Sequence, residues 1–140
     1  MKNLKLLTIL IATILFSNCS DDFDDKKTAE TTLSGNWNLI EVNGTIMGGK
    51  SLFAPGVITW NFNAANNTFT VVNNNTDESA LDSFDSGTYS YSVIASPVAN
   101  STCSQTIELN GGDYGCLLLT SNSLQINDGA ADGIILKFVR

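Results

Sequence analysis

The sequence predicts an all-β fold, and three observations carry this prediction. After residue 33, apolar residues recur with a period of two, which is the period of a strand with one buried face. The apolar runs are short, and residues typical of turns separate them. No segment in this part of the chain has a convincing amphipathic helical pattern. About eight short antiparallel strands within residues 33–140 therefore indicate a closed barrel or a sandwich.

Connectivity distinguishes these two architectures only in part. Each expected strand is followed by a nearby partner, as in successive hairpins. Closure of such a meander removes its exposed edges, so the pattern favours an eight-stranded up-and-down barrel. A sandwich remains open as an alternative.

The first four expected strands show the alternation most clearly. Trp60 and Phe62 lie on one face of their strand, with polar residues between them. Tyr89 and Tyr91 do the same in the sequence GTYSYSVI. These strands are expected at residues 35–42, 57–63, 68–73 and 87–94.

Four shorter strands complete the chain, and glycine, asparagine and aspartate residues mark the turns between them. They are expected at residues 106–110, 116–121, 123–128 and 133–140. Residues 76–86 form a polar loop with room for one helical turn at most.

The N-terminal residues 1–18 resemble an export signal. Lys2 and Lys5 precede an apolar run from Leu6 to Phe16, which is shorter than the roughly 20 residues of a spanning helix. The residues Phe16-Ser17-Asn18-Cys19 resemble the lipobox read by lipoprotein signal peptidase. This resemblance implies that Cys19 carries the lipid anchor of the mature chain. An uncleaved anchor helix is the alternative.

The segment after Cys19 is acidic and resembles the export signal of surface-displayed flavobacterial-type lipoproteins. The resemblance implies an outer-membrane protein that faces the outside of the cell. A solvated tether over residues 19–32 and a calcium site are the other interpretations of this acidic run. The signal comprises Ser20, Asp21, Asp22, Phe23, Asp24 and Asp25.

Composition excludes several function classes. Without residues 1–18 the chain keeps all 14 acids and five of its seven basic residues, a net charge of −9, which argues against nucleic-acid binding. The absence of histidine removes the commonest general base and metal ligand. The pair Asp82 and Asp85 suits acid–base chemistry only if burial splits the two pKa values, and it lies in a polar stretch. We therefore expect one non-enzymatic domain without cofactor or metal.

Two cysteines remain once Cys19 is assigned to lipid. An exported compartment permits disulfides, so Cys103 and Cys116 are expected to pair, with two free buried thiols as the alternative.

The motif Gly35-x-Trp37 at the start of the first strand resembles the opening of lipocalins and of short bacterial lipocalin-like domains. The resemblance covers residues 33–140 and implies a barrel whose tryptophan plugs one end. Arg140 has the same parity as Leu136 and Phe138, so we expect its side chain to lie across the ring of Trp37. The Trp-x-Leu start also resembles small META-type β domains, but their Gly-Cys-Asn motif is missing here.

A barrel of eight strands has an interior that side chains fill or that holds one small ligand. The first hypothesis is a surface-anchored binding module for a small apolar or amphipathic molecule. The second is a protein-interaction subunit of an outer-membrane assembly, with a filled core. Inward-facing residues are expected to be Trp60, Phe62, Phe69, Tyr89, Tyr91, Leu118, Ile126, Leu136 and Phe138. The candidate ligand-binding residues are the aromatic ones: Trp60, Phe62, Phe69, Tyr89, Tyr91 and Phe138.

Overall fold

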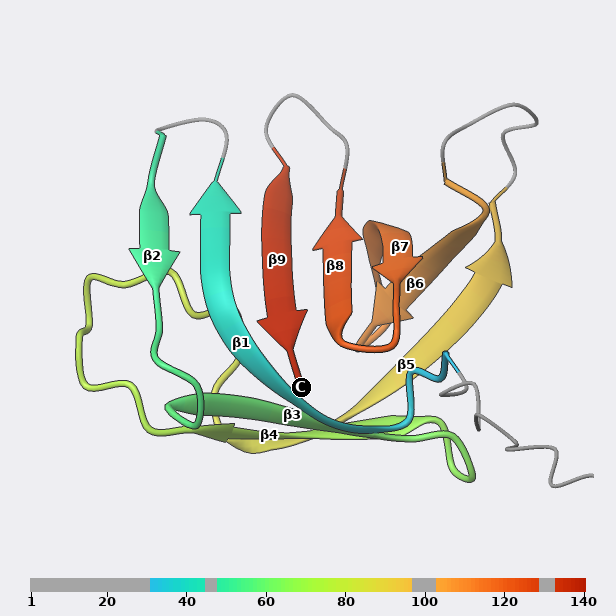
Figure 1. Ribbon diagram of the computed structural model, residues 1–140, viewed down its shortest axis with the longest axis horizontal. Helices are drawn as coiled ribbons and strands as arrows, with labels where there is room; N and C mark the ends of the chain where they lie inside the picture. The colour runs from blue at the N-terminus through green and yellow to red at the C-terminus, as the bar shows by residue number, and fades with distance from the viewer. Residues whose placement is uncertain (1–30, 45–47, 97–102, 129–132) are drawn as a thin grey trace, which may run out of the picture.

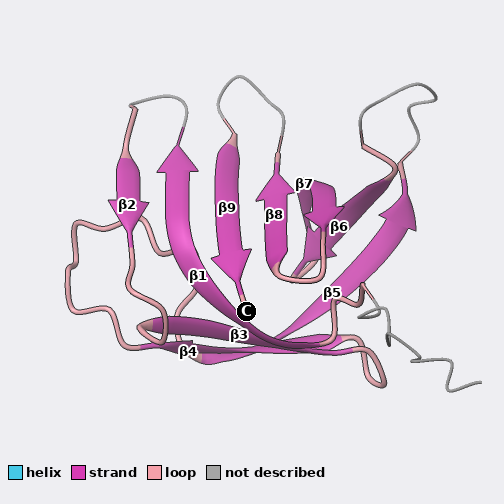
Figure 2. Cartoon of the chain, in the orientation of Figure 1, coloured by secondary structure: helices cyan, strands magenta, loops and turns pink. Residues whose placement is uncertain are grey.

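The computed structural model describes residues 31–44, 48–96, 103–128 and 133–140. Within these ranges the chain forms nine strands and no helix (Figures 1 and 2). The strands are β1 (Gly35–Gly44), β2 (Lys50–Leu52), β3 (Ile58–Asn63), β4 (Thr68–Asn73), β5 (Gly87–Ala95), β6 (Gln105–Leu109), β7 (Gly112–Leu119), β8 (Ser123–Asn127) and β9 (Ile134–Val139).

The sheet is a closed antiparallel barrel. Strands β3 to β9 pair with their neighbours in sequence order, and β1 pairs with both β3 and β9. The closing contact aligns Leu39 with Phe138 and Val42 with Leu136. The predicted eight-stranded up-and-down barrel is thus confirmed, and the alternative of a sandwich is wrong.

Strand β2 is additional to the eight expected strands. It pairs with the second half of β1, where Glu41 faces Leu52, while the first half of β1 pairs with β3. The curvature of β1 in Figure 1 makes this division possible. The sequence Lys-Ser-Leu is too short to show alternation, so the pattern did not reveal this strand.

The barrel interior is filled by the apolar face of each strand. In β3, Ile58, Trp60 and Phe62 are buried, whereas Asn61 and Asn63 between and beyond them are exposed. No polar or charged residue of the described ranges is buried. The core comprises Leu33, Trp37, Leu39, Val42, Ile58, Trp60, Phe62, Phe69, Val71, Tyr91, Ile107, Leu109, Leu117, Leu124, Ile126, Leu136 and Phe138.

The prediction that Leu118 faces inward is wrong. Leu118 is 43% exposed and its neighbour Leu117 is buried. Strand β7 begins at Gly112, earlier than expected, and its pairing with β6 shifts at Ile107/Glu108. Such a shift moves the following residues to the opposite face.

The predicted disulfide is present. It joins Cys103, just before β6, to Cys116 in β7, with the two Cα atoms 5.6 Å apart. The bond pins the start of β6 to the outer face of β7, because Leu117, the next residue along, faces inward.

The barrel has two unlike ends. At the first, called the sealed end, β1 begins, β9 finishes and residues 64–67 and 120–122 connect strands. At the second, called the loop end, residues 74–86 connect β4 to β5 and residues 110–111 connect β6 to β7. In Figure 1 the 74–86 loop runs beside β2 at the left, away from the blue segment that leads into β1.

Candidate functional site

The six aromatic residues predicted as ligand-binding all face the barrel interior. Five are buried, and Tyr89 is half-buried against the core. The ring of Trp60 is central: its centroid lies 4.8 Å from that of Phe69, with the two rings stacked. It also meets Phe138 edge-on at 4.9 Å. These side chains therefore form one aromatic cluster and not separate contacts.

Phe84 completes this cluster, although it comes from a loop and no sequence pattern indicated it. Its ring meets Trp60 at 5.3 Å and Phe69 at 5.4 Å, in both cases nearly perpendicular at 88°. It also lies 4.9 Å from Tyr89 and 5.6 Å from Tyr114. The one sequence feature that could have pointed to Phe84 is that it is a single aromatic residue inside a long polar loop. We call the position that its ring occupies the Phe84 seat.

Hydrogen bonds fold the 74–86 loop so that Phe84 points inward. Asn73 Nδ2 donates to Asp82 Oδ2 at 2.9 Å and to the carbonyl of Phe84 at 3.0 Å. The amide of Phe84 donates to the carbonyl of Asp82 at 2.9 Å. Asn75 Nδ2 donates to the same Asp82 carboxylate at 3.2 Å. Asp82, considered above as part of a catalytic pair, thus braces the loop, and Asp85 is exposed.

Two buried polar atoms, one on Trp60, which contacts Phe84, and one on Ser83, which precedes Phe84, have no hydrogen-bond partner among the described residues. They are Trp60 Nε1 and Ser83 Oγ. Such an atom costs about 1–3 kcal/mol. Ser83 also has a φ of 71°, a left-handed conformation that costs a residue with a side chain about 1–2 kcal/mol. Strain of this kind concentrates at ligand clamps and switch regions.

Tyr114 borders the Phe84 seat from β7. Burial raises the pKa of its phenol, and the negative charge of Asp128 raises it further. Burial likewise raises the pKa of Tyr91. Both phenols are therefore neutral donors at physiological pH.

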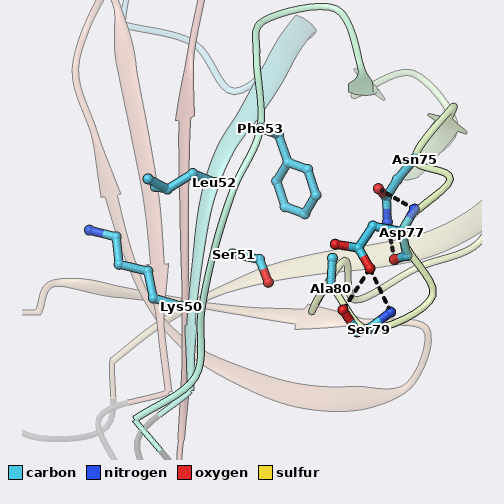
Figure 3. A pocket seen from close by; sticks show the side chains of 8 residues that line it. All are labelled: Lys50, Ser51, Leu52, Phe53, Asn75, Asp77, Ser79 and Ala80. Carbon is cyan, nitrogen blue, oxygen red and sulfur yellow. Dashed lines mark hydrogen bonds between the residues drawn. The ribbon is translucent and has the colours of Figure 1, made fainter.

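Two polar surface pockets flank the 74–86 loop. The first holds about 350 Å³ between β2 and the loop, and Figure 3 shows Ser51 and Phe53 directed toward it while Lys50 and Leu52 point away. Asp77 accepts hydrogen bonds from the amide and hydroxyl of Ser79, which hold the pKa of this carboxyl below its usual value. The second pocket, of about 440 Å³, is lined by acidic residues of the loop, namely Asp77, Glu78, Asp82 and Asp85.

Among the residues that the structure describes, no group of three or more His, Cys, Asp or Glu side chains is arranged to hold a metal ion.

The sealed end brings together the two residues predicted to form the plug. Trp37 is fully buried, and the guanidinium carbon of Arg140 lies 4.0 Å from its ring centroid. Arg140 Nη2 also donates to the carbonyls of Thr32 at 2.6 Å and Ser34 at 2.7 Å. The indole of Trp37 donates to the carbonyl of Leu33 at 2.7 Å. The plug therefore fixes the segment that leads into the barrel.

The predicted signal peptide, Cys19 and the acidic signal at residues 20–25 lie outside the described residues. The described ranges contain no helix of sufficient length and hydrophobicity to cross a membrane.

Comparison of the chain with models of protein families, with curated proteins and with solved structures finds no match.

Proposed function

We propose that this chain is a surface-anchored lipoprotein whose barrel is a non-enzymatic binding module for a small apolar or amphipathic ligand. The observation that supports this function is the difference between the two barrel ends. Trp37 and Arg140 close the sealed end with a cation–π contact and three hydrogen bonds to main-chain carbonyls. At the loop end, the ring of Phe84 from the 74–86 loop covers the aromatic cluster, and Phe53 from the segment after β2 also packs against the core. A container with one fixed end and one loop-covered end suits the uptake of one small molecule.

The sealed end also indicates where the tether joins the barrel. Arg140 holds Thr32 and Ser34, so the preceding residues leave the barrel at this end. Residues 19–31 reach roughly 45 Å when fully extended. A lipid on Cys19 would thus attach the domain to the membrane through its sealed end. The net charge of −9 calculated for the mature chain would repel an anionic membrane surface, so the lipid would supply the membrane attachment.

The anchoring part of the proposal is tested by Cys19→Ala. We expect the variant protein to leave the membrane fraction, because the acyl chains provide its attachment. Retention in the membrane at the wild-type level would contradict the anchor.

The surface part of the proposal is tested at the acidic signal. Replacement of Asp21, Asp22, Asp24 and Asp25 by alanine should lower the accessibility of the protein to protease added to intact cells. Unchanged accessibility would remove the surface assignment.

The binding part is tested by native mass spectrometry of the intact protein purified from its membrane. Retention of a small molecule, or uptake of fatty acids or lipid-extract components, is the expected result. The control is the same protein unfolded and refolded without lipid, which should lose the retained mass. No retained mass and no uptake would contradict a ligand-binding function.

A second function is favoured by a specific observation. The seventeen buried apolar side chains fill the described interior, and the two pockets beside the 74–86 loop are polar and open to solvent. A filled barrel suits a protein-interaction subunit of an outer-membrane assembly, with its loops as the contact surface. Crosslinking in intact cells that captures a defined outer-membrane protein, together with no ligand uptake, would select this function.

A further inference from the structure

We propose that Phe84 is an exchangeable stopper, and that a small neutral ligand with a planar ring and a hydrogen-bond acceptor binds by taking the Phe84 seat. This inference rests on the proposed ligand-binding function and adds the place and the chemistry of the ligand. It is argued from the ring contacts of Trp60 and from the backbone strain and unpartnered hydroxyl of Ser83, the residue before Phe84.

Phe84 is the replaceable neighbour of Trp60. Four rings contact Trp60, and three of them are fixed on barrel strands: Phe62 on β3, Phe69 on β4 and Phe138 on β9. Displacement of any of these three rings would disturb the paired strands. Displacement of Phe84 requires only a rearrangement of the 74–86 loop. A ligand that reaches Trp60 would therefore enter through the Phe84 seat.

The resting arrangement leaves two polar groups unsatisfied, one on Trp60, whose ring borders the seat, and one on Ser83, which precedes the stopper. Trp60 Nε1 is a fully buried donor without an acceptor among the described residues. Ser83, which precedes the stopper, combines a φ of 71° with a buried hydroxyl that also lacks a partner. Outward movement of Ser83 and Phe84 relieves the strain and hydrates the hydroxyl. A ligand acceptor then satisfies the indole N–H.

The walls of the seat define the class of ligand. The nearly perpendicular contacts with Trp60 and Phe69, and the closer alignment with Tyr114 at 36°, surround one flat ring. The indole donor requires an acceptor, such as a carbonyl oxygen, on that ring. Asp82 and Asp85 flank the stopper and disfavour an anion. We therefore expect a ring with a neutral carbonyl group to bind better than a plain ring or a ring carboxylate.

The test uses acetophenone, toluene and benzoate as probes on the purified protein. The chain has two tryptophans, so its indole N–H region in an NMR spectrum contains two signals. Trp37 already donates to Leu33, and its signal serves as the internal reference. Acetophenone should shift the Trp60 signal downfield, in the direction of a new hydrogen bond, and leave the Trp37 signal in place. Toluene should produce no such downfield shift, and benzoate should bind most weakly.

Phe84→Ala empties the seat and should lower the apparent Kd for acetophenone by about tenfold or more, because the competing side chain is gone. The matched control is Leu81→Ala in the same loop, whose side chain lies near Gly44 and Gly49 and is 40% exposed. It should bind as the wild type does. Adding Trp60→Phe to Phe84→Ala should abolish the preference for acetophenone over toluene.

The outcomes separate this inference from the function on which it rests. Uptake of lipid by the wild type with an unmoved Trp60 signal, or with equal affinity in the Phe84→Ala variant, would overturn the stopper and leave the binding function standing. Absence of binding of every probe and of every lipid component would overturn both. If Phe84→Ala fails to fold, the titration of the wild-type indole signals decides the question alone.

Discussion

At the scale of single residues, Gly115 shows how one position changes a whole strand face. Its φ is +88°, and a Cβ atom built there would clash with the carbonyl oxygen of Asn127. Only glycine permits this close approach of β7 to β8. The irregular pairing of β6 with β7 lies beside Gly115, which is why Leu117 is buried and Leu118 is exposed.

Ser83 provides the first prediction at this scale. Ser83→Gly should raise the free energy of unfolding by about 1 kcal/mol. Relief of the left-handed strain and removal of the unpartnered hydroxyl together outweigh the extra unfolded-state entropy of glycine. Urea unfolding of the purified protein measures the change. Ser83→Ala is the control, since it removes the hydroxyl and keeps the strain. A lower unfolding midpoint for the glycine variant would show that this residue is not strained.

Tyr114 provides a prediction on pH. Burial and Asp128 raise its folded-state pKa above the usual 10.0, so the contribution of this group to stability is complete below about pH 10. That contribution is lost as the pH rises through the folded-state pKa. Ultraviolet absorbance should record two late-titrating tyrosines, Tyr91 and Tyr114, of which one disappears in Tyr114→Phe and moves to lower pH in Asp128→Asn. An unaltered titration curve in both variants would contradict this assignment.

At the scale of elements, β1 organises the barrel because it pairs with β2, β3 and β9. A register shift between Leu39 and Glu41 bends the strand and lets its two halves serve different neighbours. On the outer face, Glu41 joins these elements by ion pairs with Lys50 at 3.0 Å and Lys137 at 2.8 Å. Hydrogen bonds from Lys137 and then Lys50 lower the pKa of Glu41.

The plug that joins β1 to β9 leads to a stability prediction. Trp37→Ala should lower the free energy of unfolding by roughly 3–5 kcal/mol, because the ring is fully buried. It would also leave Arg140 without its aromatic partner. Thermal or urea unfolding measures the loss. The neighbouring exposed residue supplies a control, Asn36→Ala, which should change stability little. A near-neutral Trp37→Ala variant would argue against the plug.

At the scale of the whole molecule, closure by β1 and β9 makes the barrel one cooperative unit. The amides of this pair should exchange with solvent deuterium only through global unfolding. Those of β2, which pairs along one side with β1 alone among the described strands, should exchange through local opening. Native-state hydrogen exchange in increasing denaturant measures both classes. Exchange of the β1–β9 amides well below the global free energy would show that the barrel opens at this seam.

The sequence alone determined most of the barrel, since the alternation around Trp60, Phe62, Tyr89 and Tyr91 is a local consequence of strand geometry. It also indicated the disulfide, because the number of cysteines and the expected export restricted the choice. It did not indicate β2, the face of Leu118 or the position of Phe84. These depend on which strands meet, where their register shifts and how a polar loop folds back over the core. Such contacts join residues far apart in the chain, so no local period records them, and only the tertiary structure decided them.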